Sequence, residues 1–311
     1  MVQKVRFLRR TINFFMKIQN IKDTDHLFKT LKIEKNYLSN NQKLSLNKKG
    51  YIIFPPTKVL IRKIRLLNKV TSSLIKKEKD KGGWEGKEKH YRKGKKFEDG
   101  ANRLGNLINK DQVFSDLILL PEILASAHEV IKGDIKIGGV DLRNPLKGKG
   151  FQRLHIDWLP RRKKIDKYIG VVCFIFLDNA NKKNGPLRVI PGSHKIMGWP
   201  DDKIDILKKH PKEVKIFAKA GSICVMNLNL WHGGSNNISG NPRKAILIDI
   251  RRRDQPQLLN FKKYLNKNKI NSLSEKHKYL LSIRKVDKDQ KMDSFGPGDA
   301  YRKEMKKRKD V

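Results

Sequence analysis

The sequence predicts a mainly β domain with flanking helices, in which the strands form a sandwich or a barrel. After residue 134, short apolar runs alternate with turn residues, a pattern typical of such folds. These runs are "DIKIGGVDLRN", "FQRLHIDW", "KYIGVVCFIFLDN", "GPLRVIPGS", "EVKIFAKAGSICVMNL", "LWHGGS" and "RKAILIDIRR". Helical patterns precede these runs and do not alternate with them, so a doubly wound α/β fold is not expected.

The first 41 residues predict a basic helical extension. Val5, Leu8, Ile12 and Phe15 lie at helical spacing, and no acidic residue occurs before Asp23. A helix that packs on the domain is the favoured interpretation, with a membrane-surface helix or a targeting segment as alternatives. No apolar run reaches the roughly 18 residues that a membrane span needs.

Residues 42–133 predict a strand followed by helices. "GYIIFPP" is a short strand that ends at two prolines, and "KVLIRKIRLLNKVTSSLIKK" has the apolar spacing of an amphipathic helix. Residues 79–105 are rich in glycine and charge, which indicates a long loop that borders a site. "DQVFSDLILLPEILASAHEVIKG" predicts two helices, with Asp111 as the N-cap of the first and Pro121 at the start of the second.

The chain therefore divides into a central domain and two basic extensions. The domain spans residues 42–255, with a helical part over 42–133 and the strand core over 134–255. The segment 256–311 is lysine-rich and contains one more predicted helix, "SEKHKYLLSIRK", before a charged tail.

The charge of the chain is extreme for its length of 311 residues. It has 71 lysines and arginines against 31 acidic residues, a formal net charge of +40. Attraction to nucleic acid, to an acidic membrane or to an anionic substrate is one interpretation. The favoured one is compositional, because lysine is spread along the whole chain and is not gathered on one segment. A nucleic-acid partner is therefore not expected.

The chain has two cysteines, Cys173 and Cys224, and both lie in apolar strand-like runs. Buried free thiols in a reducing compartment are the favoured interpretation, which places the protein in the cytoplasm. The sequence alone leaves a disulfide open.

A histidine and an aspartate in "QRLHIDW" are the first candidates for chemistry. In a strand, residues two apart point to the same face, so His155 and Asp157 would project together. An imidazole and a carboxylate on one face are two of the three ligands of a non-haem iron(II) facial triad. His232 in "NLNLWHGGSNN", 77 residues further on (232 − 155), is the candidate for the third. Taken alone, the H-x-D pair is more often a surface salt bridge.

An arginine after His232 extends this group. An oxygenase that uses 2-oxoglutarate needs a fixed cation for the far carboxylate, and an arginine offers two-point binding. Arg243 follows His232 by 11 residues (243 − 232), across the Gly/Ser/Asn/Pro-rich loop of "WHGGSNNISGNPRKAILIDI". We expect a hairpin to return Arg243 to the side of His232.

The ordered motifs resemble the phytanoyl-CoA dioxygenase family of iron(II)/2-oxoglutarate oxygenases over residues 42–255. The similar segments are "LNKKGYIIFPP", "FQRLHIDWLP", "NGPLRVIPGSHK" and "AGSICVMNLNLWHGGSNNISGNPRKAI". The resemblance implies a double-stranded β-helix, the cupin-like jelly roll, flanked by helices. It implies iron ligation by His155, Asp157 and His232, with Arg243 as the anchor of 2-oxoglutarate.

The resemblance bears on four further positions. Family members often carry a hydroxyl residue two positions after the closing histidine, whereas this chain has Gly234 followed by Ser235, so that contact is in doubt. Gln152 is a candidate contact of the co-substrate, with a structural role as the alternative. His194 in "PGSHK" is expected to cap a loop and not to bind the metal.

The resemblance thus implies a dioxygenase that uses iron(II), 2-oxoglutarate and dioxygen to hydroxylate a small molecule, with release of succinate and CO2. The carboxylate at Asp157 favours hydroxylation, because related halogenases have a small residue there and bind chloride. The basic segment 84–103 favours an anionic substrate. An oxygenase acting on nucleic acid and a non-catalytic jelly-roll binding protein are the alternatives.

Overall fold

The computed structural model describes residues 20–161, 163 and 167–287. The helix predicted over residues 5–15 and the charged tail from residue 288 lie outside this part of the chain. No helix among the described residues is both long and apolar enough to cross a membrane.

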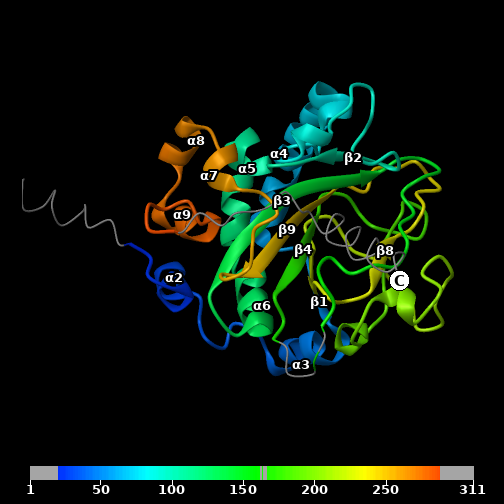
Figure 1. The fold of residues 1–311 in the computed structure, drawn as a ribbon, viewed down its shortest axis with the longest axis horizontal. Helices are drawn as coiled ribbons and strands as arrows, with labels where there is room; N and C mark the ends of the chain where they lie inside the picture. Colours follow the sequence, from blue (N-terminus) through cyan, green and yellow to red (C-terminus); the bar gives the residue numbers. More distant parts are fainter. Residues whose placement is uncertain (1–19, 162, 164–166, 288–311) are drawn as a thin grey trace, which may run out of the picture.

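Two antiparallel sheets form a jelly roll (Figure 1). The larger sheet has the strand order β1-β7-β4-β9-β3-β2, and the smaller sheet has the order β6-β5-β8. The strands are β1 (Tyr51–Phe54), β2 (Ala101–Leu104), β3 (Ile135–Pro145), β4 (Gly170–Phe176), β5 (Leu187–Val189), β6 (Val214–Ile216), β7 (Ile223–Asn227), β8 (His232–Gly234) and β9 (Ala245–Arg252).

Helices surround the larger sheet in the described part of the chain. They are α2 (Thr24–Leu31), α3 (Asn40–Lys49), α4 (Lys58–Glu78), α5 (Leu107–Lys110), α6 (Pro121–Ile131), α7 (Phe261–Tyr264), α8 (Lys267–Ser272) and α9 (Glu275–Leu281). Short 3-10 helices are η1 (Lys79–Lys81), η2 (Glu88–His90), η3 (Gln112–Leu119), η4 (Ser193–Lys195) and η5 (Pro200–Asp202). Helix α6 packs across β3, β4, β7 and β9 and so covers the outer face of the larger sheet (Figure 1).

Strand β4 illustrates how the two faces of the larger sheet are used. Its odd-numbered residues, such as Cys173 and Ile175, belong to the core between the sheet and the helices. Its even-numbered residues, such as Phe174 and Phe176, belong to the core between the two sheets. Because successive side chains alternate, a strand covered on both faces is apolar throughout, as "GVVCFIF" is.

Several predicted elements are confirmed. "GYIIFPP" forms β1, the amphipathic pattern forms α4, and "SEKHKYLLSIRK" contains α9. The two cysteines are buried free thiols. Cys224 lies directly opposite Phe174 in the β4–β7 ladder.

Three local predictions are wrong. "FQRLHIDW" is not a strand: in this segment only His155 forms a β-bridge, with His232, because the opposing chain makes a turn in which Leu230 donates to Asn227 O. Strands β8 and β9 do not form a hairpin, since β8 pairs with β5 in the smaller sheet and β9 pairs with β3 and β4 in the larger one.

The third concerns residues 112–119, which form the 3-10 helix η3 instead of an α-helix. Pro121 disfavours the α region for the residue before it, and Leu120 is extended (φ −61°, ψ 125°). The Asp111 side chain still caps this element, as predicted, by accepting from the Val113 N–H.

The described parts of both predicted extensions pack on the same core as the central domain. From the N-terminal side, Ile21 and Leu27 are buried in the core between the larger sheet and the helices. From the C-terminal side, Phe261 and Tyr279 are buried there too. The boundaries at residues 41 and 256 remain a prediction from the sequence.

Candidate functional site

Backbone pairing between two distant segments brings together His155, Asp157 and His232. His155 and His232 exchange backbone hydrogen bonds of 2.9 and 3.0 Å, and the Asp157 N–H donates to Leu228 O at 2.9 Å. The two imidazole rings are 4.3 Å apart between centroids. The structure therefore places the three predicted ligands side by side, although the segment around His155 is not a regular strand.

The donor atoms of this group converge on one point. His155 Nε2 lies 3.6 Å from Asp157 Oδ1, and His232 Nε2 lies 3.5 Å from Asp157 Oδ2. One ligand atom from each residue can be chosen so that all three lie within 4.8 Å of one another. This spacing is compatible with three bonds of about 2.0–2.2 Å to one transition-metal ion.

Hydrogen bonds determine which ring nitrogens face Asp157 with a lone pair. His155 Nδ1 lies 2.8 Å from Arg153 O, and His232 Nδ1 lies 2.9 Å from Leu230 O. A carbonyl oxygen only accepts, so each Nδ1 carries the proton and each Nε2 presents a lone pair. Such backbone contacts orient metal-binding histidines in many proteins.

The acceptor atoms of this group have no hydrogen-bonded lysine or arginine among the described residues. Burial, followed by the neighbouring His232, lowers the pKa of His155 to about 4, so its imidazole is neutral near pH 7. The Asp157 carboxylate therefore lies between the neutral His155 Nε2 and the His232 Nε2. A bound metal ion would satisfy all three, and the donor set of two imidazoles and one carboxylate fits iron(II).

Arg243 is buried two residues before β9. Its exposed fraction is 2%, and its Nε has no hydrogen-bond partner among the described residues. Its backbone N–H donates to Asn144 Oδ1 on β3 at 3.0 Å. Burial, followed by the neighbouring Arg143, lowers the pKa of Arg243 to about 9, so the guanidinium remains charged near pH 7. A buried unpaired guanidinium favours binding of an anion.

The segment before His155 lies against β8. The Gln152 N–H donates to Gly234 O at 3.0 Å, and Gln152 Oε1 would lie 3.1 Å from a Cβ added at Gly234. Such a Cβ would also lie 2.6 Å from Gly150 O, so the backbone leaves no room for a side chain at position 234. The hydroxyl contact in doubt from the sequence is therefore absent at this position, and the Ser235 Oγ is buried without a partner among the described residues.

Sequence reasoning missed a charged pair beside this group. Arg143 on β3 is 4% exposed and its Nη2 lies 2.6 Å from Glu98 Oε1. Arg103 Nε lies 3.8 Å from Glu98 Oε2. Asp141 and Arg143 alternate with the apolar Val140 and Leu142 in "GGVDLRN", and this alternation could have indicated charged residues on the inner face.

His194 lies outside the metal-ligating group, as expected. Its exposed fraction is 1%, and its Nε2 lies 3.0 Å from Asn47 O, near the end of α3. Its Nδ1 faces Gly50, where an added Cβ would lie 2.5 Å from the nitrogen. Packing against the Gly50 backbone leaves no room for a ligand at this histidine.

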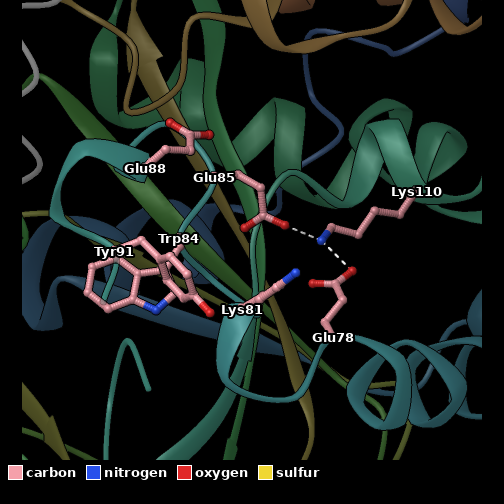
Figure 2. Close-up of a pocket in the computed structure, with 7 residues that line it drawn as sticks. All are labelled: Glu78, Lys81, Trp84, Glu85, Glu88, Tyr91 and Lys110. Carbon is pink, nitrogen blue, oxygen red and sulfur yellow. Dashed lines mark hydrogen bonds and ion pairs between the residues drawn. The ribbon is translucent and has the colours of Figure 1, made fainter. Parts of the chain in front are cut away.

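A separate pocket of about 450 Å³ lies in the segment that the sequence predicted to be a basic loop (Figure 2). Lys110 is ion-paired with both Glu78 and Glu85 in it, and Trp84 and Tyr91 form one wall (Figure 2). The lining residues are Glu78, Lys81, Trp84, Glu85, Glu88, Tyr91 and Lys110. Three glutamates thus face this pocket, in addition to two lysines.

A jelly roll in which two histidines and one carboxylate converge is typical of non-haem iron(II) oxygenases. The family model for phytanoyl-CoA dioxygenase (PhyH) matches residues 63–245, more than half of the chain. The chain belongs to the phytanoyl-CoA dioxygenase family.

Individual proteins show the same relationship. Dioxygenase trt7 of Aspergillus terreus is 26% identical over 161 residues, which are 49% of this chain and 54% of that protein. Dioxygenase af480 of Aspergillus fumigatus is 32% identical over 183 residues, 57% of each. The chain thus spans little more than half the length of these relatives.

The crystal structure of HygX from Streptomyces hygroscopicus, with nickel and 2-oxoglutarate bound, has the same fold. It superimposes with a TM-score of 0.54 at 13% identity and covers 71% of this chain and 89% of HygX.

Proposed function

We propose that the chain is an iron(II)- and 2-oxoglutarate-dependent dioxygenase that hydroxylates a small molecule. In this proposal His155, Asp157 and His232 hold the metal, and Arg243 holds the far carboxylate of 2-oxoglutarate. The observation that carries the proposal is the convergence of three metal-ligating acceptors in a chain of this family. Bound iron(II) supplies the oxidative decarboxylation of 2-oxoglutarate by dioxygen, coupled to substrate hydroxylation, with succinate and CO2 as by-products.

The protein's own part is to hold the ligands and exclude water. Hydrogen bonds from the histidine Nδ1 atoms to backbone carbonyls fix both rings. Leu154, Ile156 and Trp231 form an apolar cluster beside the ligands, which excludes water from that side. Related halogenases have a small residue at the position of Asp157, which leaves room for chloride on the metal. The carboxylate of Asp157 therefore supports hydroxylation and not halogenation.

Four finer statements belong to the same proposal. Residues 42–255 form the dioxygenase domain, and Gln152 contributes to the co-substrate pocket, a role supported by its place beside Gly234. The substrate is an anionic small molecule and not a nucleic acid, supported by a net charge of +40 that is spread along the chain and not gathered in one segment. The protein acts in the cytoplasm, supported by the two buried thiols.

Succinate formation tests the proposal. The purified protein is supplied with iron(II), ascorbate, 2-oxoglutarate and dioxygen, and then with small molecules of either charge. We expect succinate release that requires all of these components and rises with a true substrate, which gains one oxygen atom by mass spectrometry. Replacing Asp157 by alanine should lower the rate more than about 100-fold, since loss of groups that only orient metal ligands already costs about 10–100-fold. Wild-type protein that loads iron(II) but releases no succinate would contradict the proposal.

A further inference from the structure

Two buried arginines lie close together on the inner face of the larger sheet. In the β3–β9 ladder Arg143 is directly opposite Ala245, two residues after Arg243. Arg243 lies just beyond the end of this ladder, and its backbone N–H donates to the side chain of Asn144, the residue after Arg143. The two guanidinium groups also interact electrostatically, because Arg143 helps to lower the pKa of Arg243. Arg143 therefore lies near the predicted co-substrate anchor.

The guanidinium of Arg143 is only partly paired. Its Nε lies 3.1 Å from each Glu98 carboxylate oxygen, and its Nη2 donates to Glu98 Oε1 at 2.6 Å and to Gly150 O at 2.9 Å. Its Nη1 has no partner among the described residues, although the side chain is 5% exposed. Arg243 Nε is likewise buried without a partner in this part of the chain. Buried guanidinium groups with unused donors favour binding of an anion.

The position of Gly234 shows where Arg143 Nη1 lies. A Cβ added at Gly234 would be 3.0 Å from this nitrogen. His232 and Gly234 are two residues apart on β8, which corresponds to the same face of the strand and a separation of about 7 Å. Arg143 Nη1 thus lies beside Gly234, the next residue after His232 on the same face of β8.

We propose that Arg143 is a second binding residue for 2-oxoglutarate, which holds its far carboxylate together with Arg243, and that Glu98 is the positioning residue for Arg143. This inference rests on the proposed function. Arg103, Arg143 and Arg243 against Glu98 and Asp141 leave one positive charge, which the far carboxylate would neutralise. The unused Nη1 of Arg143 and Nε of Arg243 are the donors for it. Gly234 is required because a side chain there would meet both Gly150 O and the Arg143 guanidinium.

The test is the dissociation constant of 2-oxoglutarate, measured calorimetrically without dioxygen on the manganese(II)-loaded protein. We expect Arg143→Gln to raise it about 10- to 100-fold, because a hydrogen bond to a charged group is lost in a buried site. Arg143→Lys should have a smaller effect, since the charge remains. Arg253→Gln is the matched control: it also breaks a part-buried arginine–carboxylate pair, here with Asp287, and should change the constant less than twofold.

A second probe identifies the carboxylate involved. 2-Oxobutanoate has the metal-binding end of 2-oxoglutarate but no far carboxylate, so wild type and Arg143→Gln should bind it equally. Gly234→Ala should weaken 2-oxoglutarate binding without removing any charge. Glu98→Gln should raise KM for 2-oxoglutarate and leave kcat near the wild-type value, as expected for a residue that acts through Arg143.

The outcomes separate the inference from the function on which it rests. If Arg143→Gln binds 2-oxoglutarate within twofold of wild type while Arg243→Gln binds weakly, the inference is wrong and the proposed function stands. If wild-type protein loaded with metal binds no 2-oxoglutarate, the proposed function fails and the inference with it. Should Arg143→Gln not fold, Arg143→Lys and Gly234→Ala decide by the same constant, and unchanged binding in both would overturn the inference.

Discussion

Two clusters of acceptor groups in this chain differ in whether they contain a cation. In the pocket of Figure 2, the Lys110 ammonium is ion-paired with both Glu78 and Glu85. In the other cluster, Asp157 faces the Nε2 atoms of His155 and His232, and among the described residues no lysine or arginine is hydrogen-bonded to these groups. The first cluster has its counter-charge built in, whereas the second needs one from outside.

This difference distinguishes a structural cluster from a ligand site. Burial raises the pKa of Glu78, and the hydrogen bond and charge of Lys110 oppose that rise, so the lysine helps to keep the glutamate ionised. In the metal-ligating group, no lysine or arginine of the described residues is hydrogen-bonded to Asp157, and burial keeps the His155 imidazole neutral near pH 7. A bound metal ion would supply the positive charge that Lys110 supplies in the other cluster.

The largest stability effect is expected from removing the built-in cation. Lys110→Met leaves Glu78 and Glu85 facing each other with little solvent, and should lower the free energy of unfolding by about 3 kcal/mol, the lower end of the range for breaking a buried pair. We choose the lower end because the partners are 12–24% exposed. Urea denaturation measures the change.

An exposed ion pair provides the control for this variant. Lys63 pairs with Asp116, and their side chains are 30% and 54% exposed, so Lys63→Met should change stability by less than about 1 kcal/mol. Equal losses in the two variants would break the comparison, because they would mean that Lys110 is no more than a surface charge. Lys110→Met should also bind metal as the wild type does.

A somewhat smaller effect on stability is expected from His194, a buried histidine outside the metal-ligating group. Burial lowers the pKa of His194 to about 4, below its ordinary value of about 6.5. In the window between these values the unfolded chain binds a proton that the folded chain does not, so stability falls as the pH falls. The contribution of His194 is about 2 kcal/mol between pH 7 and pH 5.

The variant His194→Gln isolates this contribution. Glutamine can still donate to Asn47 O but does not titrate in this range, so the loss of stability on acidification should be smaller by about 2 kcal/mol than in wild type. Unfolding free energies of both proteins at pH 7 and pH 5 give the comparison. Identical pH dependence in the two would show that His194 is not a neutral, packed residue.

Much of the fold could be predicted from periodicity and turn residues. Strands such as β4 and β9 are apolar and β-branched enough to be found by pattern, and α4 has the spacing of an amphipathic helix. The convergence of His155, Asp157 and His232 could be anticipated because their types and order are specific in combination. Short-range signals were sufficient for these elements, whereas β2 lies within a segment that the sequence predicted to be a loop.

Other features depend on contacts between distant segments and could not be predicted. The chain around His155 pairs with residues 228–234, whose turn interrupts any ladder, and the pattern within "FQRLHIDW" contains no trace of that turn. The separation of β8 and β9 into different sheets is likewise a property of the whole topology. The pair of Arg143 and Glu98 joins residues 45 positions apart, so only the folded chain reveals it.

A measurement of metal binding tests most directly whether His155, Asp157 and His232 hold a metal ion. Iron(II), or manganese(II) in its place, is titrated without dioxygen into wild type, Asp157→Ala and Lys110→Met, and the bound metal is counted per chain. We expect one ion per chain in wild type and Lys110→Met, and an affinity lowered more than about 100-fold in Asp157→Ala. Metal bound equally by wild type and Asp157→Ala would contradict it, as would a wild-type protein that binds no metal.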